Sequence, residues 1–169
     1  AVVLVVAVLL CFPSAKRWVA GRWSGAGPIQ SLAVLPLANL SGDPEREYLA
    51  DGMTEELITQ LGKAMPLRVI SRQSVMQFKG TTLSLGEIGR KLSVDGIVEG
   101  SVVQSGGRVR VTARLVDAAT EKPLWSEEYD RDLRDVLSLQ GEVTRAIAQE
   151  IRVQLTPQEQ ANLTKARPV

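Results

Sequence analysis

The chain has 169 residues, of which 44% are hydrophobic and 23% are charged, so it can bury a core and does not have a disordered composition. Its formal net charge of +1 gives no overall attraction to nucleic acid or to an anionic surface. It contains no histidine, and its one cysteine, Cys11, can form neither an internal disulfide nor a cysteine-based zinc site. The composition thus removes the commonest general base and the commonest metal ligand.

Residues 1–12 are an uncharged apolar run that is followed by a basic pair, Lys16 and Arg17. Because the chain starts with alanine, we expect a fragment of a longer protein, with residues 1–18 as the end of a membrane anchor. A signal-peptide core and a buried element of a soluble fold are the alternatives. The glycine- and proline-containing residues 19–30 are predicted as a linker.

From residue 31 onward the pattern predicts strands that alternate with helices. An apolar run over 32–35 ends at Pro36 and is typical of a strand that is buried on both faces. Asp43 can cap a helix that starts at Pro44 and stops before Pro66. This helix has an apolar face, because large apolar residues recur every four positions: Leu49, Met53, Leu57 and Leu61. A second strand is expected over 67–70.

The second half begins with Ser84 and Glu87, which match the capping box of a short helix. A strand is expected over 94–103, with Gly96 and Gly100 as bulges or close-packing points. The sequence Ser-Gly-Gly at 105–107 predicts a hairpin turn.

The next strand alternates between an apolar face and an arginine-rich face, and a turn near 119–120 leads to a last strand. That strand carries Trp125 and Tyr129, which we expect to pack on the sheet. From Asp132 to Leu155 the apolar period is helical, and a new capping box at 156–159 predicts a further helix.

These elements define an α/β fold in the order β-α-β-α-β-β-β-α. The first half can form parallel strands through helical crossovers, whereas the second half is an antiparallel meander. We therefore expect one mixed sheet with helices packed on it, over residues 31–155. Residues 156–169 are expected to start a helical extension.

Four stretches of this block resemble the domain related to the TolB amino-terminal domain: AVLPLANLSGDPEREYLADGMTEELITQL, LRVISRQSV, EIGRKLSVDGIVEGSV and RVRVTARLVDAATEKPLWSEEYDRDL. The resemblance implies a module of large bacterial signalling proteins that follows a membrane segment and precedes tetratricopeptide repeats. It also implies a single-pass protein of the bacterial inner membrane with a periplasmic domain. The basic pair after the apolar run normally marks the cytoplasmic side, so the orientation stays open.

The function implied by the resemblance is that of a non-catalytic protein-interaction or sensing domain. The alternatives are the regulatory part of a class III adenylate or guanylate cyclase or of a protein kinase, and the sensor part of a winged-helix transcription regulator. No catalytic, cofactor-binding or metal-binding residues carry over, so we expect no cofactor and no direct contact with nucleic acid. The expected partners are a protein, the following helical repeats and, through residues 1–18, the membrane.

One candidate interaction surface is acidic. Asp51 and Glu55 are four residues apart and share a helix face beside Glu56, where they could bind a cation. No liganding loop accompanies them, which favours a solvated helix face instead.

The other candidate surface is basic. Arg108, Arg110 and Arg114 lie on one strand face and could hold a phosphate or an acidic partner. Glu127 and Glu128 are on the next strand, so cross-strand ion pairing is the alternative role.

Overall fold

The computed structural model describes residues 28–154, with side chains up to residue 152. The predicted segments 1–18 and 156–169, and Leu155, lie outside the described residues. The elements in chain order are β1 (Ser31–Val34), β2 (Ala38–Asn39), η2 (Pro44–Arg46), α2 (Glu47–Ala64), β3 (Arg68–Val69), α3 (Arg72–Met76), α4 (Leu85–Leu92), β4 (Gly96–Ser105), β5 (Arg108–Asp117), β6 (Pro123–Asp132), η3 (Leu133–Asp135) and α5 (Val136–Gln154).

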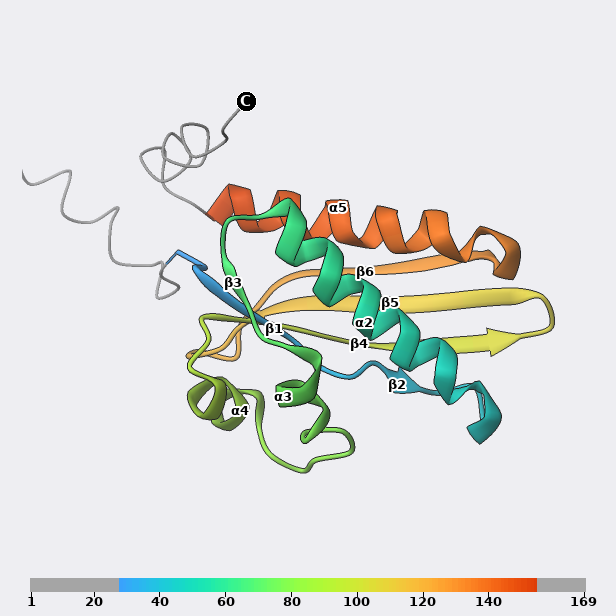
Figure 1. Cartoon of the computed structure of the whole chain (residues 1–169), viewed down its shortest axis with the longest axis horizontal. Helices are drawn as coiled ribbons and strands as arrows, with labels where there is room; N and C mark the ends of the chain where they lie inside the picture. Colours follow the sequence, from blue (N-terminus) through green and yellow to red (C-terminus); the bar gives the residue numbers. More distant parts are fainter. Residues whose placement is uncertain (1–27, 155–169) are drawn as a thin grey trace, which may run out of the picture.

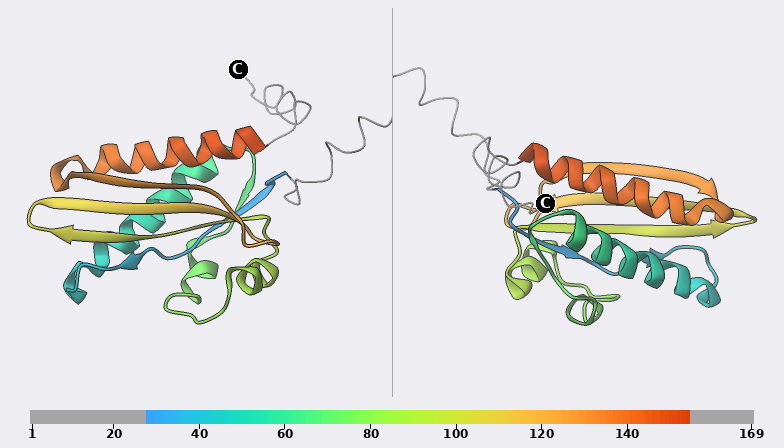
Figure 2. Two further views of the ribbon diagram at one scale, coloured as in Figure 1. Left: turned by 180° about the vertical axis from the view of Figure 1, so that it is seen from behind. Right: turned by 45° about the horizontal axis from the view of Figure 1, so that its top comes forward.

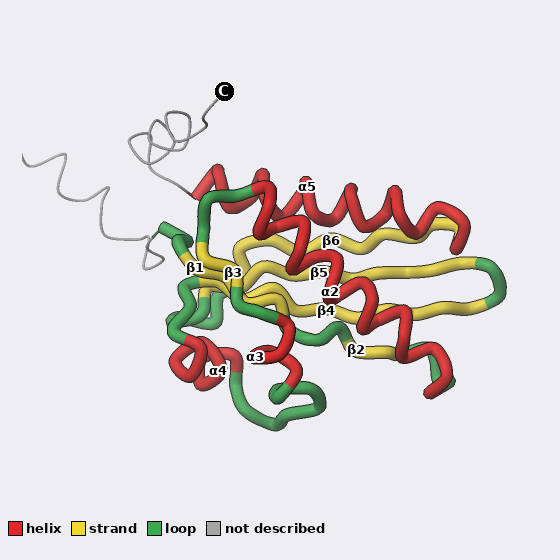
Figure 3. The backbone as a smooth tube through the Cα atoms, viewed as in Figure 1, coloured by secondary structure: helices red, strands yellow, loops and turns green. Residues whose placement is uncertain are grey.

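The strands form one mixed sheet in the order β3-β1-β4-β5-β6, with β2 also paired to β4. The pairs β1–β3, β1–β4 and β2–β4 are parallel, whereas β4–β5 and β5–β6 are antiparallel. Helices α2 and α5 lie side by side on one face of the sheet, and α3 and α4 lie at its margin (Figures 1 and 3). The predicted fold class is confirmed, including the parallel first half and the antiparallel meander.

Several local predictions are also confirmed. Asp43 Oδ1 accepts a hydrogen bond from Glu45 N at 3.0 Å and caps η2, which leads directly into α2. The capping box at the start of α4 is complete, because Ser84 and Glu87 each bond to the other's backbone N–H. Two short elements, β2 and α3, were not predicted.

Gly96 and Gly100 are close-packing points and not bulges. The β4–β5 register runs without a shift from Gly96 opposite Asp117 to Ser105 opposite Arg108. A Cβ at Gly100 would lie 2.0 Å from the carbonyl oxygen of Thr112, so only glycine fits there. The register irregularity lies instead between β5 and β6, at Leu115 and Val116.

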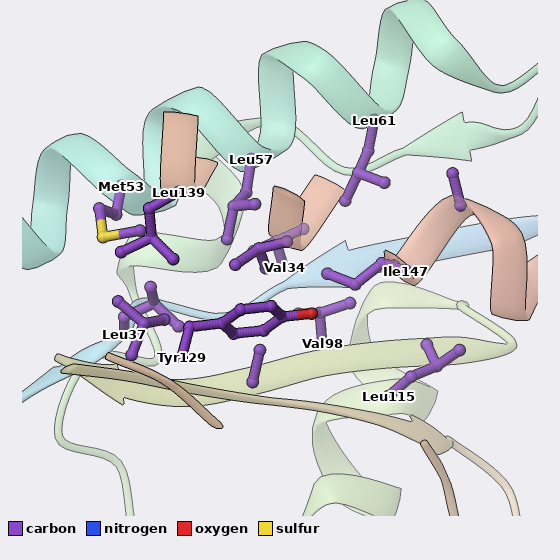
Figure 4. Packing of buried hydrophobic residues seen from close by; sticks show 14 of the residues in the cluster. Val34, Leu37, Met53, Leu57, Leu61, Val98, Leu115, Tyr129, Leu139 and Ile147 are labelled. Carbon is purple, nitrogen blue, oxygen red and sulfur yellow. The ribbon is translucent and has the colours of Figure 1, made fainter. Parts of the chain in front are cut away.

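The larger of two apolar cores lies between the sheet and the α2/α5 layer. The predicted stripe of α2 is buried in it: Leu49, Met53, Leu57 and Leu61. Residues of α5 and of β4 to β6 meet this stripe from the other sides, as Figure 4 shows for Leu139, Ile147 and Tyr129. Ile29 is also in this core at 2% exposure, so the packed unit extends into the segment predicted as a linker.

The smaller core lies beneath α3 and α4, near the start of β4. It comprises Ala33, Leu35, Ile70, Val75, Phe78, Ile88, Val94, Ile97 and Ala118. Gly89 packs so closely that a Cβ there would lie 2.7 Å from the Cβ of Ala118. Since β1 contributes side chains to both cores, it is buried on both faces, as its apolar run predicted.

Two polar joints hold the first strands in place, and the sequence pattern did not reveal either. The buried Thr54 hydroxyl of α2 accepts a hydrogen bond from Leu37 N at 3.0 Å, next to Pro36, where the chain leaves β1. Asp95 Oδ2 accepts hydrogen bonds from the N–H groups of Gln30 and Ser31 and from the Ser31 hydroxyl, at 3.1, 2.9 and 2.7 Å. The chain is therefore held at both ends of β1 by contacts with residues that are distant in the sequence.

Candidate interaction surface

The sheet face opposite α2 and α5 carries the predicted arginines. Successive residues of a strand point to opposite faces, so the arginines of β5 alternate with Val109, Val111, Ala113 and Leu115, which are buried under the helices. Seen from behind, the long strands β4, β5 and β6 form this face, with α2 behind them and α5 along their upper edge (Figure 2, left). The three arginine side chains are about half exposed.

Arg108 and Arg110 converge on one carboxylate of β6. Arg108 Nε donates to Asp130 Oδ1 at 2.7 Å, and Arg110 Nη2 donates to Asp130 Oδ2 at 3.1 Å. Arg110 Nε also lies 3.4 Å from Glu128 Oε1. The hydrogen bonds from Arg108 and Arg110 lower the pKa of Asp130, so this carboxylate stays ionised. The predicted cross-strand pairing is confirmed for Glu128, while the principal partner, Asp130, was missed.

Arg114 pairs in the other direction, toward β4. Its Nε lies 3.4 Å from Glu99 Oε1, across the register in which Glu99 and Arg114 are directly opposite. Glu127, by contrast, lies on the helix-covered face and accepts a hydrogen bond from the Tyr129 hydroxyl at 2.5 Å. The expected pairing of Glu127 with the arginines is therefore wrong, since neighbouring strand residues face opposite sides.

The acidic candidates lie on α2 and face the segment that contains α3. Asp51 Oδ1 is 2.6 Å from Lys79 Nζ, and Glu55 Oε2 is 2.9 Å from Arg72 Nε. Glu47 joins the same row, 2.6 Å from Lys79 Nζ. Asp51 and Glu55 thus form ion pairs with Lys79 and Arg72 of the same chain. The structure does not bring them together with the arginines of the open sheet face.

The chemistry of both surfaces is that of charge pairing. Among residues 28–152, no group of three or more histidine, cysteine, aspartate or glutamate side chains is placed to hold a metal ion. Burial, together with the hydrogen bond to Glu127, raises the pKa of Tyr129, so this phenol remains neutral. The open face offers arginines and carboxylates in exposed pairs, which suits recognition of another charged surface.

Solved structures define the class of fold to which this domain belongs. TolB from Acinetobacter baumannii aligns with a TM-score of 0.54 and 16% identity, covering 75% of this chain and 30% of TolB. Lipoprotein GNA1162 from Neisseria meningitidis aligns with a TM-score of 0.52 and 23% identity, covering 75% of this chain and 99% of that one. The TolB-like fold that the sequence resemblance implied is therefore present.

Sequence comparison then gives the family. The family model for the second domain of HilA/YgeH-like transcriptional regulators matches residues 29–150, so the chain belongs to this family. A protein of Rhizobium meliloti (strain 1021) named "Putative adenylate cyclase 3" is 46% identical over 130 residues, or 77% of this chain. The chain covers 22% of that relative's length, so most of the relative lies outside the shared region.

The predicted anchor would be a membrane-spanning helix. Within residues 28–154, no helix combines the length and the apolar character needed to cross a membrane. The apolar run on which the anchor prediction depends, residues 1–12, lies outside the described residues.

Proposed function

We propose that this chain is a non-catalytic protein-interaction or sensing domain of a membrane-anchored bacterial signalling protein. The observation that carries the proposal is the match to a much longer relative, of which this domain forms 22% at 46% identity. In this proposal the domain regulates an output that lies elsewhere in the parent protein. The family, named after the second domain of transcriptional regulators, supports the same role.

Two output classes are candidates for the parent protein. The name of the Rhizobium relative favours a nucleotide cyclase, for which this domain would be the regulatory part. The family match favours a transcription regulator, for which it would be the sensor part. The sequence preceding residue 1 in the parent distinguishes these two classes directly.

Within this role, the open sheet face is the proposed contact surface for a protein partner. Arg108, Arg110 and Arg114 and their carboxylate partners are exposed enough to exchange internal pairs for pairs with another protein. Asp51 and Glu55 are a second proposed contact, available only when Lys79 and Arg72 release them. The helical repeats that we expect after residue 156 would add to the partner surface.

The proposed location is the bacterial inner membrane, with residues 1–18 as the anchor and the folded domain in the periplasm. The uncharged run over residues 1–12 supports the anchor. Fractionation of cells that produce the parent protein, followed by protease treatment of spheroplasts, tests both points. Recovery in the soluble fraction would reject the anchor, and protection of the domain in spheroplasts would reject the periplasmic orientation.

The regulatory role is tested in the parent protein by reversing charge on the open face. The double variant Arg108→Glu with Arg110→Glu should change the output, measured as cyclic nucleotide formation or reporter transcription, by at least several-fold. Arg90→Glu, an exposed arginine on α4, is the matched control and should leave the output unchanged. Equal output from the double variant, the control and the wild type would contradict a role for this face in signalling.

A further inference from the structure

Residues 71–83, which contain α3 and the loop after it, have no backbone hydrogen bond to the described sheet, unlike the strand residues before them. The last backbone hydrogen bond to the sheet before them joins Ile70 N to Leu32 O, at 2.9 Å. The next one after them joins Asp95 N to Ser31 O, at 3.2 Å. Between these points, the backbone hydrogen bonds of residues 71–83 within the described structure are all local.

Two buried apolar side chains anchor this segment, and the partly buried Leu83 packs against the same core. Val75 is fully buried and Phe78 is 8% exposed, and both insert into the smaller core beneath α3. Around them the segment is largely polar and exposed, and it contains Gly80, whose φ of +68° lies in the left-handed region that favours glycine. Figure 3 shows α3 and its following loop at the margin of the fold, beyond the sheet.

Ion pairs to α2 complete the attachment. Lys79 Nζ lies 2.6 Å from both Glu47 Oε1 and Asp51 Oδ1, and Arg72 Nε lies 2.9 Å from Glu55 Oε2. The three carboxylates are four residues apart along α2, so they form one row that faces the segment. The side chains in these pairs are 26–55% exposed, so dissolved salt weakens the pairs.

We propose that residues 71–83 form a strap that opens as a unit while the sheet, α2 and α5 stay folded, and that the ion pairs of Lys79 and Arg72 keep it closed. Opening withdraws Val75 and Phe78 from the smaller core and frees the carboxylate row of α2. Units of this kind, with few buried contacts and only local backbone bonds, open at lower free energy than the strands they cover. The strap therefore responds to ionic strength, or to a cation that competes for α2.

Hydrogen exchange of the full chain in nonionic detergent, followed by mass spectrometry of peptic peptides, tests this proposal. In low salt, a peptide within residues 71–83 should exchange faster than peptides from β5. Raising the salt to molar concentration, or the substitution Lys79→Met, should increase the exchange rate of the strap by a further roughly 3- to 10-fold. The increase is modest because exposed ion pairs contribute little to stability. Exchange of β5 should not change.

Matched variants separate the ion pairs from a general loss of stability. Lys63→Met, an exposed lysine near the end of α2, should leave the strap unchanged. Arg72→Glu should increase the exchange rate of the strap. Adding Glu55→Arg should restore the wild-type rate, because the ion pair forms again with its two charges exchanged. The proposal is overturned if the strap exchanges only as fast as β5, or if neither salt nor Lys79→Met changes its rate.

Discussion

The two apolar cores of this domain are built by different means. The larger core joins long elements, since helices of 18 and 19 residues cover three strands of 10 residues each. The smaller core joins short elements, since α3 has 5 residues and α4 has 8, and a capping box, ion pairs and tight glycine contacts support them. Equal burial of a side chain should therefore have unequal consequences in the two regions.

The largest effect is expected from placing a charge in each core. Leu57 and Val75 are both at 0% exposure. Leu57→Asp should unfold the domain, because a buried unpaired charge costs several kcal/mol of a total stability of roughly 5–15 kcal/mol. Val75→Asp should loosen residues 71–83 and leave the larger core intact. Circular dichroism melts, with hydrogen exchange of β5 peptides, measure the difference.

Glu56→Lys is the control for Leu57→Asp, because Glu56 is the adjacent residue on α2 and its side chain accepts a hydrogen bond only from Gln60 of the same helix. The change should cost about 0.5 kcal/mol or less, as for other surface substitutions. Equal melting temperatures for the two α2 variants would show that the assigned helix face is wrong. Global unfolding of Val75→Asp would show that the two cores are one cooperative unit.

A second test compares two glycines with opposite surroundings. Gly100→Ala should destabilise the β4–β5 pair by about 2–3 kcal/mol, because its Cβ would lie 2.0 Å from the Thr112 carbonyl oxygen. Gly52→Ala, on α2 with nothing within 4 Å of the new Cβ, should stabilise by roughly 0.5–1 kcal/mol. Chemical denaturation of both variants gives the two free energies of unfolding, and a shared sign would contradict the close-packing role of Gly100.

A smaller effect is expected from the capping box of α4. Ser84→Ala removes the hydroxyl that accepts from Glu87 N and should cost about 1 kcal/mol. The loss should fall on the smaller core, so exchange should quicken in α4 but not in β5. Ser138→Ala, an exposed serine on α5, is the matched control and should be close to neutral. Equal effects of the two substitutions would show that the capping box does not stabilise the smaller core.

The smallest expected effect is a pH dependence of stability that arises from the open sheet face, outside both cores. The pKa of Asp130 is lowered in the folded state from an ordinary value of 3.8, chiefly by its hydrogen bonds from Arg108 and then Arg110. A lowered pKa gives stability that is fully present above about pH 4 and lost as the pH falls through the folded-state value.

The difference in melting temperature between the wild type and Asp130→Asn should therefore be constant from pH 7 to pH 5 and should shrink below pH 4. Salt should shrink it as well, because the pairs are exposed. A difference that grows as the pH falls would contradict the charge-pair account of this face.

The sequence predicted those features that depend on residues near one another in the chain. The apolar stripe of α2 and the Ser84–Glu87 capping box of α4 each involve residues of one helix, and the alternation of β5 involves residues of one strand. The strand Ala38–Asn39 and the helix Arg72–Met76 are too short to show a period, so they were missed. The bonds of Ser31 to Asp95 join residues 64 apart, and no local pattern reports them.

The candidate surface shows why pairing partners are harder to predict than strands. The irregularity at Leu115 and Val116 shifts the β6 register, so that Asp130 lies opposite Arg110 and Tyr129 opposite Val111. A one-residue change in register would exchange the faces of all β6 side chains relative to β5. The bulge therefore decides that Glu128, and not Glu127, shares the face of the arginines, and the alternation in the sequence does not locate the bulge.

The β4–β5 hairpin lies far from the two ends of the described chain. Figure 1 shows β1 beginning and α5 ending at the same end of the sheet, whereas the β4–β5 turn lies at the opposite end. A strand of 10 residues spans roughly 30 Å, so the Gly106–Gly107 tip stands about that distance from the point where the chain enters and leaves. Both ends of the described residues thus lie together at one end of the domain, and the β4–β5 hairpin projects from the other end.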